Sequence, residues 1–373
     1  MRQGTDAWSK AARNAATRSS GATVLVSSSC IGPPGGARPP GGRVQGGRAG
    51  RNRERSAAAR SVHGGTGGVH ARPIRRRAPV PRSAHDGHPR PPPERPGPAD
   101  DGPDTIVLVH GFWVTPRSWE EWKTHYEAKG YRVLTPAYPG FEVEVEALNA
   151  DSTVIAELTL PKIMEHLETV VGALEKPPII IGHSAGGTLT QLLLDRGYGA
   201  VGVVLNSAPT EGVRVLPLSQ LKSTFTAFKN PANHHRAVPL TYEQWHYAFT
   251  NTFPEDESRR LYERYAIPAS GRILWDSVLA NFMPGPQDAA VDYKNEARPP
   301  LLFVSGSEDH IMPPSVQRSN VKHYTSAVLT EHEEYPGYAH LLPAQEGWEA
   351  IADHALEWAV SHAVMSRQAA AQR

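Results

Sequence analysis

The chain has 373 residues, of which 39% are hydrophobic and 21% charged, a composition ordinary for soluble globular domains. Its formal net charge of +1 combines a basic and an acidic part, because residues 1–100 carry 18 Lys and Arg against 5 Asp and Glu, whereas residues 101–373 carry 21 against 33. No stretch approaches the roughly 20 apolar residues that a membrane-spanning helix needs, so we expect no stable membrane insertion.

The first hundred residues contain 16 Gly and 13 Pro, and Trp8 is their only aromatic residue. Such a segment cannot bury enough apolar surface to offset the entropy of ordering, about 1–2 kcal/mol per residue for the backbone. We therefore predict disorder for residues 1–102, and also for the C-terminal residues 366–373. The single cysteine, Cys30, lies in the first segment, so the rest of the chain has neither a disulfide nor a thiolate metal site.

The arginines of the first segment, such as Arg72 and Arg75, could neutralise phosphates. No aromatic residue is interleaved to stack on bases, so we expect a solvated basic tail and no nucleic-acid partner. The apolar cluster at residues 22–26 is shorter than the h-region of a secretory signal, about 7 to 15 residues, so we expect a cytoplasmic location. An organellar transit peptide and a translation start near residue 100 are open alternatives.

From residue 104 onward, apolar runs typical of buried strands alternate with helical patterns. Strands are expected at residues 105–109, 131–135, 178–181, 201–205, 301–304 and 327–330. Helices are expected between most of them, at residues 118–129, 160–174, 186–196, 314–323 and 344–362. This alternation predicts an α/β fold with a mostly parallel central sheet and helices on both faces. In such sheets, ligands bind at the carboxyl ends of the strands.

One connection, between residues 205 and 301, is too long for a single helix between two strands, and a segment of this length within a compact domain must be structured. Its amphipathic patterns predict helices at about residues 216–229, 241–252, 255–266 and 273–282. We interpret residues 210–297 as a helical cap inserted before the penultimate strand, and residues 103–209 and 298–365 as the core domain. Aromatic residues of the cap either form its own core or line an apolar substrate cavity: Phe225, Phe228, Trp245, Phe249 and Trp275.

The strongest local signal is the sequence Gly-His-Ser-Ala-Gly at residues 182–186, which follows the strand Ile-Ile-Ile and opens a helix. This G-x-S-x-G pattern in a strand, turn, helix context indicates a nucleophilic serine, Ser184, on a sharp turn. The flanking glycines allow a strained turn that larger side chains would block. The alternative interpretation makes Ser184 an ordinary helix N-cap.

A serine hydroxyl is a weak nucleophile, so it needs a base that is itself oriented by an acid. Asp309 follows the strand at 301–304 and is the candidate acid, with Glu308 and Glu211 as alternatives. His340 lies in the long loop after the last strand and is the candidate base, with His332 as its competitor.

An acyl-transfer site also needs donors for the oxyanion that forms on attack. The first strand ends in His110-Gly111-Phe112-Trp113, so the N–H groups of Phe112 and Ala185 are the candidate oxyanion hole. His110 itself is expected to bond nearby backbone. The candidate substrate-binding residues lie in these two turns and in the cap: Trp113, His183, Trp245 and Phe249.

Taken together, the HGFW turn, GHSAGG, GSEDHIMP and GYAHLL resemble the α/β-hydrolase superfamily, in that family's order, over about residues 104–362. The resemblance implies a Ser184–Asp309–His340 triad, the oxyanion hole above and a helical cap, most similar to the capped carboxylesterase and lysophospholipase-like members. It departs from the family in lacking the two antiparallel strands expected before Asp104. The sheet is therefore expected to have six strands, with a less protected edge near residue 104.

We thus expect a serine hydrolase that cleaves a small ester or acyl substrate, or else a lactone or thioester, through an acyl-enzyme. The alternatives are a cofactor-free haloperoxidase or perhydrolase, a carbon–carbon bond hydrolase, and a non-catalytic ligand-binding member of the fold. No metal or organic cofactor is expected, and the pair His234 and His235 is interpreted as solvated. The natural substrate and the oligomeric state are left open by the sequence.

Overall fold

The computed structural model describes residues 97–99 and 101–364. Of the disorder predicted for residues 1–102 and 366–373, the part at residues 1–96, 100 and 366–373 lies outside the described residues. Within the described residues the core is one six-stranded sheet in the order β2-β1-β3-β4-β7-β8, and every pair of neighbours is parallel. The strands are β1 (Thr105–Val109), β2 (Arg132–Leu134), β3 (Ile179–His183), β4 (Val201–Leu205), β7 (Leu301–Gly306) and β8 (Thr330–Tyr335). The predicted parallel α/β sheet is confirmed.

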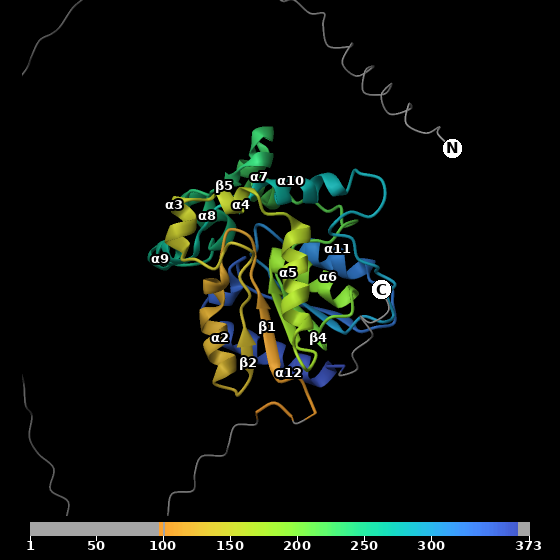
Figure 1. Ribbon diagram of the computed structural model, residues 1–373. Coiled ribbons are helices and arrows are strands. Elements are labelled where there is room, and N and C mark those ends of the chain that lie inside the picture. Colours follow the sequence, from red (N-terminus) through yellow and green to blue (C-terminus); the bar gives the residue numbers. More distant parts are fainter. Residues whose placement is uncertain (1–96, 100, 365–373) are drawn as a thin grey trace, which may run out of the picture. The chain divides into compact units, whose positions relative to one another are not determined.

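Helices cover both faces of the sheet (Figure 1). Alternate residues of β1 point to opposite faces, so Ile106 and Leu108 pack in one buried cluster while Val107 and Val109 pack in another. The first cluster includes side chains of α2 (Glu120–Glu127) and α12 (Trp348–His362), and the second those of α5 (Leu160–Gly172) and α6 (Ala185–Asp195). Because β1, β3 and β4 are covered on both faces, their sequences read as unbroken apolar runs.

The segment between β4 and β7 forms its own layer at one end of the sheet, together with α3 (Val145–Ala150) and α4 (Thr153–Ala156) (Figure 1). It contains α7 (Leu218–Phe228), α8 (Tyr242–Phe249), α9 (Glu255–Tyr265) and α10 (Gly271–Ala280), as well as the short sheet of β5 (Ala237–Val238) and β6 (Ala269–Ser270). The helices predicted for this segment are present within a few residues. That residues 210–297 act as a cap stays a prediction.

Three expectations about single elements are corrected. The last strand begins at Thr330 rather than near residue 327, and it continues to Tyr335. The edge near residue 104 is covered, because β2 pairs with β1 from Thr105 to Val107 and is itself the edge strand. The short helices α3 and α4 occupy residues for which the sequence predicted no element. Within residues 97–99 and 101–364, no helix is both long enough and apolar enough to cross a lipid bilayer.

Candidate active site

Ser184 stands at the sharp turn between β3 and α6, with φ 56° and ψ −121°. A positive φ is rare for a residue with a side chain, and here main-chain hydrogen bonds hold it. The N–H of Ser184 donates to Leu205 O (3.0 Å), and its carbonyl accepts from the N–H groups of Gly187 (2.9 Å) and Ala208 (2.8 Å). Ser184 occupies the N-cap position of α6, but its side chain makes no capping hydrogen bond to the helix, so it is not an ordinary N-cap.

Glycines at three positions let other chain segments approach this turn. A Cβ at Gly182 would lie 2.2 Å from Gly186 O, and a Cβ at Gly186 would lie 2.1 Å from Val109 O. A Cβ at Gly111 would lie 2.8 Å from the Cβ of Ser184. The turn after β1 therefore touches the serine directly, and a larger residue at any of these positions would force backbone apart.

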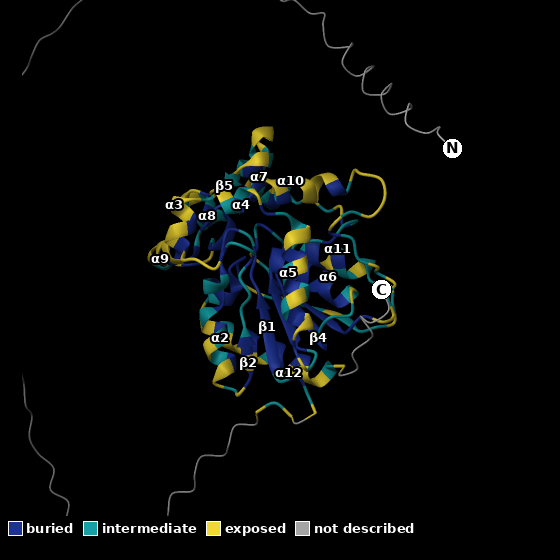
Figure 2. Ribbon diagram, viewed as in Figure 1, coloured by how far each residue is buried: buried dark blue, intermediate teal, exposed yellow. Residues whose placement is uncertain are grey.

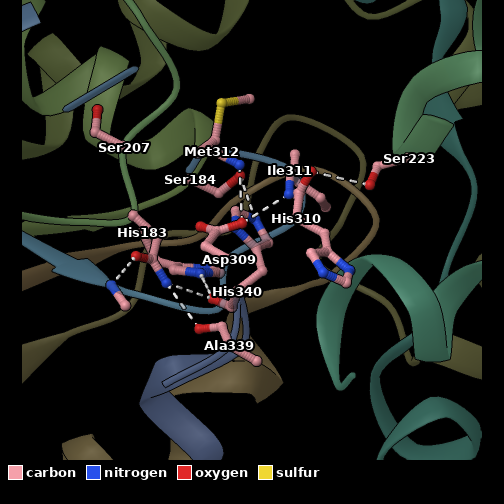
Figure 3. A network of polar contacts seen from close by, with 12 residues as sticks. His183, Ser184, Ser207, Ser223, Asp309, His310, Ile311, Met312, Ala339 and His340 are labelled. Atoms are coloured by element: carbon pink, nitrogen blue, oxygen red, sulfur yellow. Dashed lines mark hydrogen bonds and ion pairs between the residues drawn. The ribbon is translucent and has the colours of Figure 1, made fainter. Parts of the chain in front are cut away.

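Three buried side chains form a hydrogen-bonded chain at the carboxyl end of the sheet (Figure 3). The Oγ of Ser184 lies 3.0 Å from His340 Nε2, and Nδ1 of the same ring lies 2.7 Å from Asp309 Oδ2. Ser184 is 7% exposed and His340 is fully buried. The structure therefore brings together the serine, the acid and the base that the sequence selected from different loops.

The acid is fixed by main-chain donors of its own loop. Asp309 Oδ1 accepts from the N–H of Ile311 (2.7 Å) and of Met312 (2.8 Å), which leaves Oδ2 for His340. The alternatives lie elsewhere: Glu308 is exposed and accepts from Ser307 Oγ, and Glu211 accepts from the N–H of Gln287.

The competing base, His332, points away from the serine chain. It lies inside β8, where its Nε2 is 2.8 Å from Ser305 Oγ. Burial lowers its pKa. His332 thus supports the pairing of β7 with β8 on the sheet.

The turn after β1 is tied to the inserted segment through Trp113 and bonds to itself through His110. Trp113 has φ 63°, its Nε1 donates to Val238 O (3.0 Å), and its carbonyl accepts from the N–H of Ile267 (3.0 Å). His110 is fully buried, with Nδ1 2.8 Å from Gly111 O, and burial lowers its pKa to about 4. As expected, His110 bonds nearby backbone.

Phe112 and Ala185 flank the serine from two sides. Phe112 directly follows Gly111, whose backbone contacts Ser184. Ala185 is the first residue of α6, and the first N–H groups of a helix have no acceptor within it. This placement is compatible with an oxyanion hole, and that role stays a prediction.

Of the aromatic residues predicted to bind substrate, Phe249 reaches the chain of polar groups. Its ring meets the His340 ring edge-on at 5.0 Å between centroids, and Trp245 stacks behind it at 4.1 Å. Trp113 packs edge-on against Phe249 at 6.3 Å. Trp245 and Phe249 are almost fully buried, whereas Phe225 is 62% exposed, so Phe225 does not belong to an inner aromatic lining.

His183 contacts the backbone and the ring of His340. Its Nε2 is 2.7 Å from His340 O, and the two rings lie 4.9 Å apart. Burial, and then the charge on His340, lower the pKa of His183 to about 3, so it stays neutral and donates to this carbonyl. In this position His183 contacts the main chain, and a contact with substrate stays a prediction.

Asn206 is a site residue that the sequence analysis missed. It directly follows β4, is fully buried and has φ 47°. Its Nδ2 donates to the carbonyls of Ala339 and His340, both at 3.0 Å, and its Oδ1 accepts from the N–H of Gly306 at 2.8 Å. It thereby joins the loop of the base to the strand that precedes the acid.

A groove in the described part of the chain lies elsewhere. It has a volume of about 750 Å³ between α2, α9 and the start of α12, and charged side chains such as Glu120, Arg260 and Glu349 line most of it. Its lining includes none of the residues around Ser184, so hydrogen bonding rather than concavity identifies the candidate site.

Comparisons with known proteins bear on the family and the fold of the chain. Residues 106–354 match the sequence model of the "Alpha/beta hydrolase family". No curated protein is detectably similar in sequence.

Solved structures show the same fold. An extracellular alpha/beta-hydrolase from a Paenibacillus species, described as sharing structural and functional homology with tobacco salicylic acid binding protein 2, is 20% identical with a TM-score of 0.52. The match covers 68% of this chain and 98% of that one. A methylesterase from Arabidopsis is 16% identical with a TM-score of 0.50, over 69% of this chain and 98% of its own. At such identities the likeness concerns the fold alone.

Proposed function

The chain belongs to the alpha/beta hydrolase family, and from that premise we propose that it is a serine hydrolase of carboxylic esters. The observation that carries the proposal is the buried chain of hydrogen bonds from Ser184 through His340 to Asp309, at 3.0 Å and 2.7 Å. A nucleophile within reach of a base, which is in turn oriented by a third group, is the arrangement that covalent acyl transfer requires.

In the proposed reaction, Ser184 Oγ attacks the ester carbonyl while His340 Nε2 accepts the hydroxyl proton. Asp309 holds the ring so that Nδ1 carries hydrogen and Nε2 is free, and it stabilises the imidazolium that forms. The N–H groups of Phe112 and Ala185 receive the negative oxygen of the tetrahedral intermediate. His340 then protonates the departing alcohol.

Water releases the acyl group by the same route. His340 takes a proton from the water as it attacks the acyl-enzyme, and the second tetrahedral intermediate collapses to the carboxylic acid and free Ser184. Every proton in this cycle passes through Nε2 of one histidine. The anchoring of Asp309 by two backbone N–H groups supports this scheme, because it keeps the acid still as His340 alternates between its charged and neutral forms.

The test is hydrolysis of aryl esters of graded acyl length by the full chain and by Ser184→Ala. We expect the variant to lose roughly 10⁴- to 10⁶-fold in kcat, and a fluorophosphonate to label the wild type at Ser184 only. Unchanged activity in the variant would reject the proposal. Bromide-dependent halogenation in acetate and peroxide, without ester hydrolysis, would favour a haloperoxidase instead.

The role of the acid is tested with Asp309→Asn, which keeps the shape but favours the wrong tautomer of His340. We expect kcat to fall on the order of 10⁴-fold. The matched control is Glu308→Gln at the neighbouring exposed carboxylate, which should leave kcat unchanged. If the two variants behave alike, Asp309 is not the acid.

A further inference from the structure

Helix α7 exposes three large apolar residues to solvent, while two of its uncharged polar residues face the protein. Leu218, Leu221 and Phe225 are 84%, 43% and 62% exposed, whereas Gln220 and Ser223 on the opposite face are buried. For a helix of a globular protein this arrangement is inverted. The outward face of α7 is therefore built for contact with something apolar.

The inward face of α7 sits on the loop that carries the candidate acid. Ser223 Oγ donates to His310 O at 3.1 Å, and Gln220 Nε2 lies 3.3 Å from Met312 Sδ. His310 and Met312 belong to the same loop as Asp309 and lie close to it (Figure 3). A partner on the outward face of α7 would therefore lie one helix thickness from the catalytic groups.

The end of α10 extends this apolar surface. Of the eleven large hydrophobic side chains that are strongly exposed within the described part of the chain, eight fall in residues 216–225 and 278–283. The two helices are joined by a hydrogen bond from Trp275 Nε1 to Ala227 O (3.3 Å), and the loop that precedes α7 is tied to the residue after α10 by a bond from Gly212 N to Asn281 Oδ1 (3.0 Å). Figure 2 shows exposed residues on α7 and toward the end of α10. Such a concentration of exposed apolar side chains on two neighbouring helices is typical of an interaction site.

The charge around α7 indicates the chemistry of the partner. Residues 212–236 contain four cations and no Asp or Glu, although residues 101–373 as a whole are acidic. The four are Arg214, Lys222, Lys229 and Arg236. An apolar helix face among basic residues suits an anionic lipid surface, in which apolar side chains enter the acyl boundary and cations meet the headgroups. Two copies of this face would place like charges against each other, which disfavours a symmetric dimer.

We propose that α7 and the end of α10 dock the protein reversibly on an anionic lipid surface, and, resting on the function proposed above, that its ester substrates are acyl lipids of that surface. Docking holds the Ser184 site at the lipid boundary, where such substrates are concentrated. The lipid contact is made by the side of α7 that faces away from Asp309, so the helix can remain in place during catalysis.

Vesicle sedimentation tests the docking step, using the full chain as Ser184→Ala so that no lipid is consumed. Vesicles of phosphatidylcholine and phosphatidylglycerol in equal amounts are compared with phosphatidylcholine alone. Measurements at about 1 M NaCl, where the Debye length is about 3 Å, suppress the contribution of the basic N-terminal segment and isolate apolar contact. There, the triple variant Leu218→Ser, Leu221→Ser, Phe225→Ser should bind at least about tenfold more weakly.

The matched control replaces three exposed valines elsewhere, Val143→Ser, Val360→Ser and Val364→Ser, and should bind as the parent does. At low salt, Lys222→Gln with Lys229→Gln should weaken binding to the anionic vesicles by about fivefold per lysine, without affecting the neutral ones. Equal binding by the α7 variant and the valine variant would overturn the proposal. So would a dimer in solution that only the α7 variant converts to monomer.

The proposal that the substrates are acyl lipids is tested separately, with proteins that retain Ser184. The α7 triple variant should hydrolyse a soluble short-chain ester at the parental rate and lose at least about tenfold in rate on a vesicle-borne ester. Equal losses on both esters would contradict the lipid role. If the parent hydrolyses no ester at all, the proposed function fails, while the vesicle binding of Ser184→Ala still decides the docking.

Discussion

Asn206 uses all three of its side-chain hydrogen bonds to hold other loops in place. The two carbonyls that it binds belong to Ala339 and His340, so it restrains the backbone from which the imidazole of the candidate base projects. Its positive φ of 47° is tolerated by Asn and Gly better than by other residues. We regard Asn206 as a positioning residue, because it acts on the reaction only through His340.

Asn206→Asp should distinguish a role of Asn206 in positioning His340 from a role in folding stability. The substitution keeps the acceptor for Gly306 N–H but turns an oxygen toward two carbonyls, which should displace the loop of His340 by a fraction of an ångström or more. Such a displacement lowers kcat on the order of a hundredfold, with KM unchanged and a shifted pH–rate profile. Steady-state kinetics across pH measure both effects.

Two variants sharpen that experiment. Asn206→Gly preserves the backbone conformation without the side chain and should show the same loss of kcat. Asn320→Asp alters an equally buried amide that accepts from Thr210, and it should lower stability without moving the pH–rate profile. A profile that moves in Asn320→Asp and not in Asn206→Asp would refute the positioning role.

At this scale, the sequence selected the candidate residues that have a recognisable local neighbourhood, and the structure brings them into one hydrogen-bonded chain. Ser184 lies between glycines on a strand-to-helix turn, and Asp309 and His340 each follow a strand, so position alone restricted the choice. Asn206 follows a strand as well, but its role depends on two carbonyls more than 130 positions away in the chain. No local pattern encodes such a contact, so it emerges only when the loops are folded.

The packing of α6 on β1 depends on the absence of a side chain at Gly186. In Gly186→Ala the new Cβ would lie 2.1 Å from Val109 O and 2.7 Å from His110 O. Since both atoms are backbone, α6 must move, and we expect a loss of about 3 kcal/mol or more in the free energy of unfolding. Urea denaturation measures this loss, and ester hydrolysis should fall with it.

The control for that substitution is Gly172→Ala at the end of α5. Its nearest neighbour would be Tyr198 Cε1 at an ordinary 3.5 Å, and alanine is favoured over glycine in helices by about 0.5–1 kcal/mol. Gly172→Ala should therefore be neutral or slightly stabilising. If Gly186→Ala leaves the free energy of unfolding as little changed as Gly172→Ala does, α6 has room to shift and the prediction is wrong.

The elements that were predicted well are those with strong patterns of their own. The buried strands β1 and β4 read as apolar runs, and α11 (Pro314–His323) was located to the residue. By contrast, β8 reads Thr-Glu-His-Glu-Glu-Tyr, because an edge strand is only partly buried along its length and charge protects it from pairing with other chains. Likewise α3 and α4 are too short to be stable alone and are held by burial of Val145, Leu148 and Ile155.

For the whole molecule, the two buried histidines predict sensitivity to acid. Burial lowers the pKa of His110 to about 4 and, with the nearby charge on His340, that of His183 to about 3. In the unfolded chain both pKa values return to about 6.5, so between pH 6.5 and 4 the unfolded state binds more protons than the folded one. The contribution of these two histidines to the free energy of unfolding is therefore fully present above about pH 6.5 and is lost as the pH falls.

Each histidine contributes about 1.4 kcal/mol per pH unit in that range. The free energy of unfolding, measured with urea, should thus drop by about 2–3 kcal/mol from pH 6 to pH 5. His183→Gln keeps a donor for His340 O and should reduce this slope by about half, whereas His235→Gln at an exposed position should leave it unchanged. A slope that His183→Gln does not reduce would mean that His183 is protonated in the folded protein.

The parallel pairing of β4 with β7 governs how this protein reaches its working form. These neighbouring strands are separated in the chain by the whole inserted segment, and closing a loop of roughly ninety residues costs about 4 kcal/mol in entropy. Ser184 is placed by strands that come before that closure, and Asp309 and His340 by strands that come after it. On refolding from denaturant, helical circular dichroism should therefore recover before esterase activity, and lengthening the inserted segment should slow the second phase only.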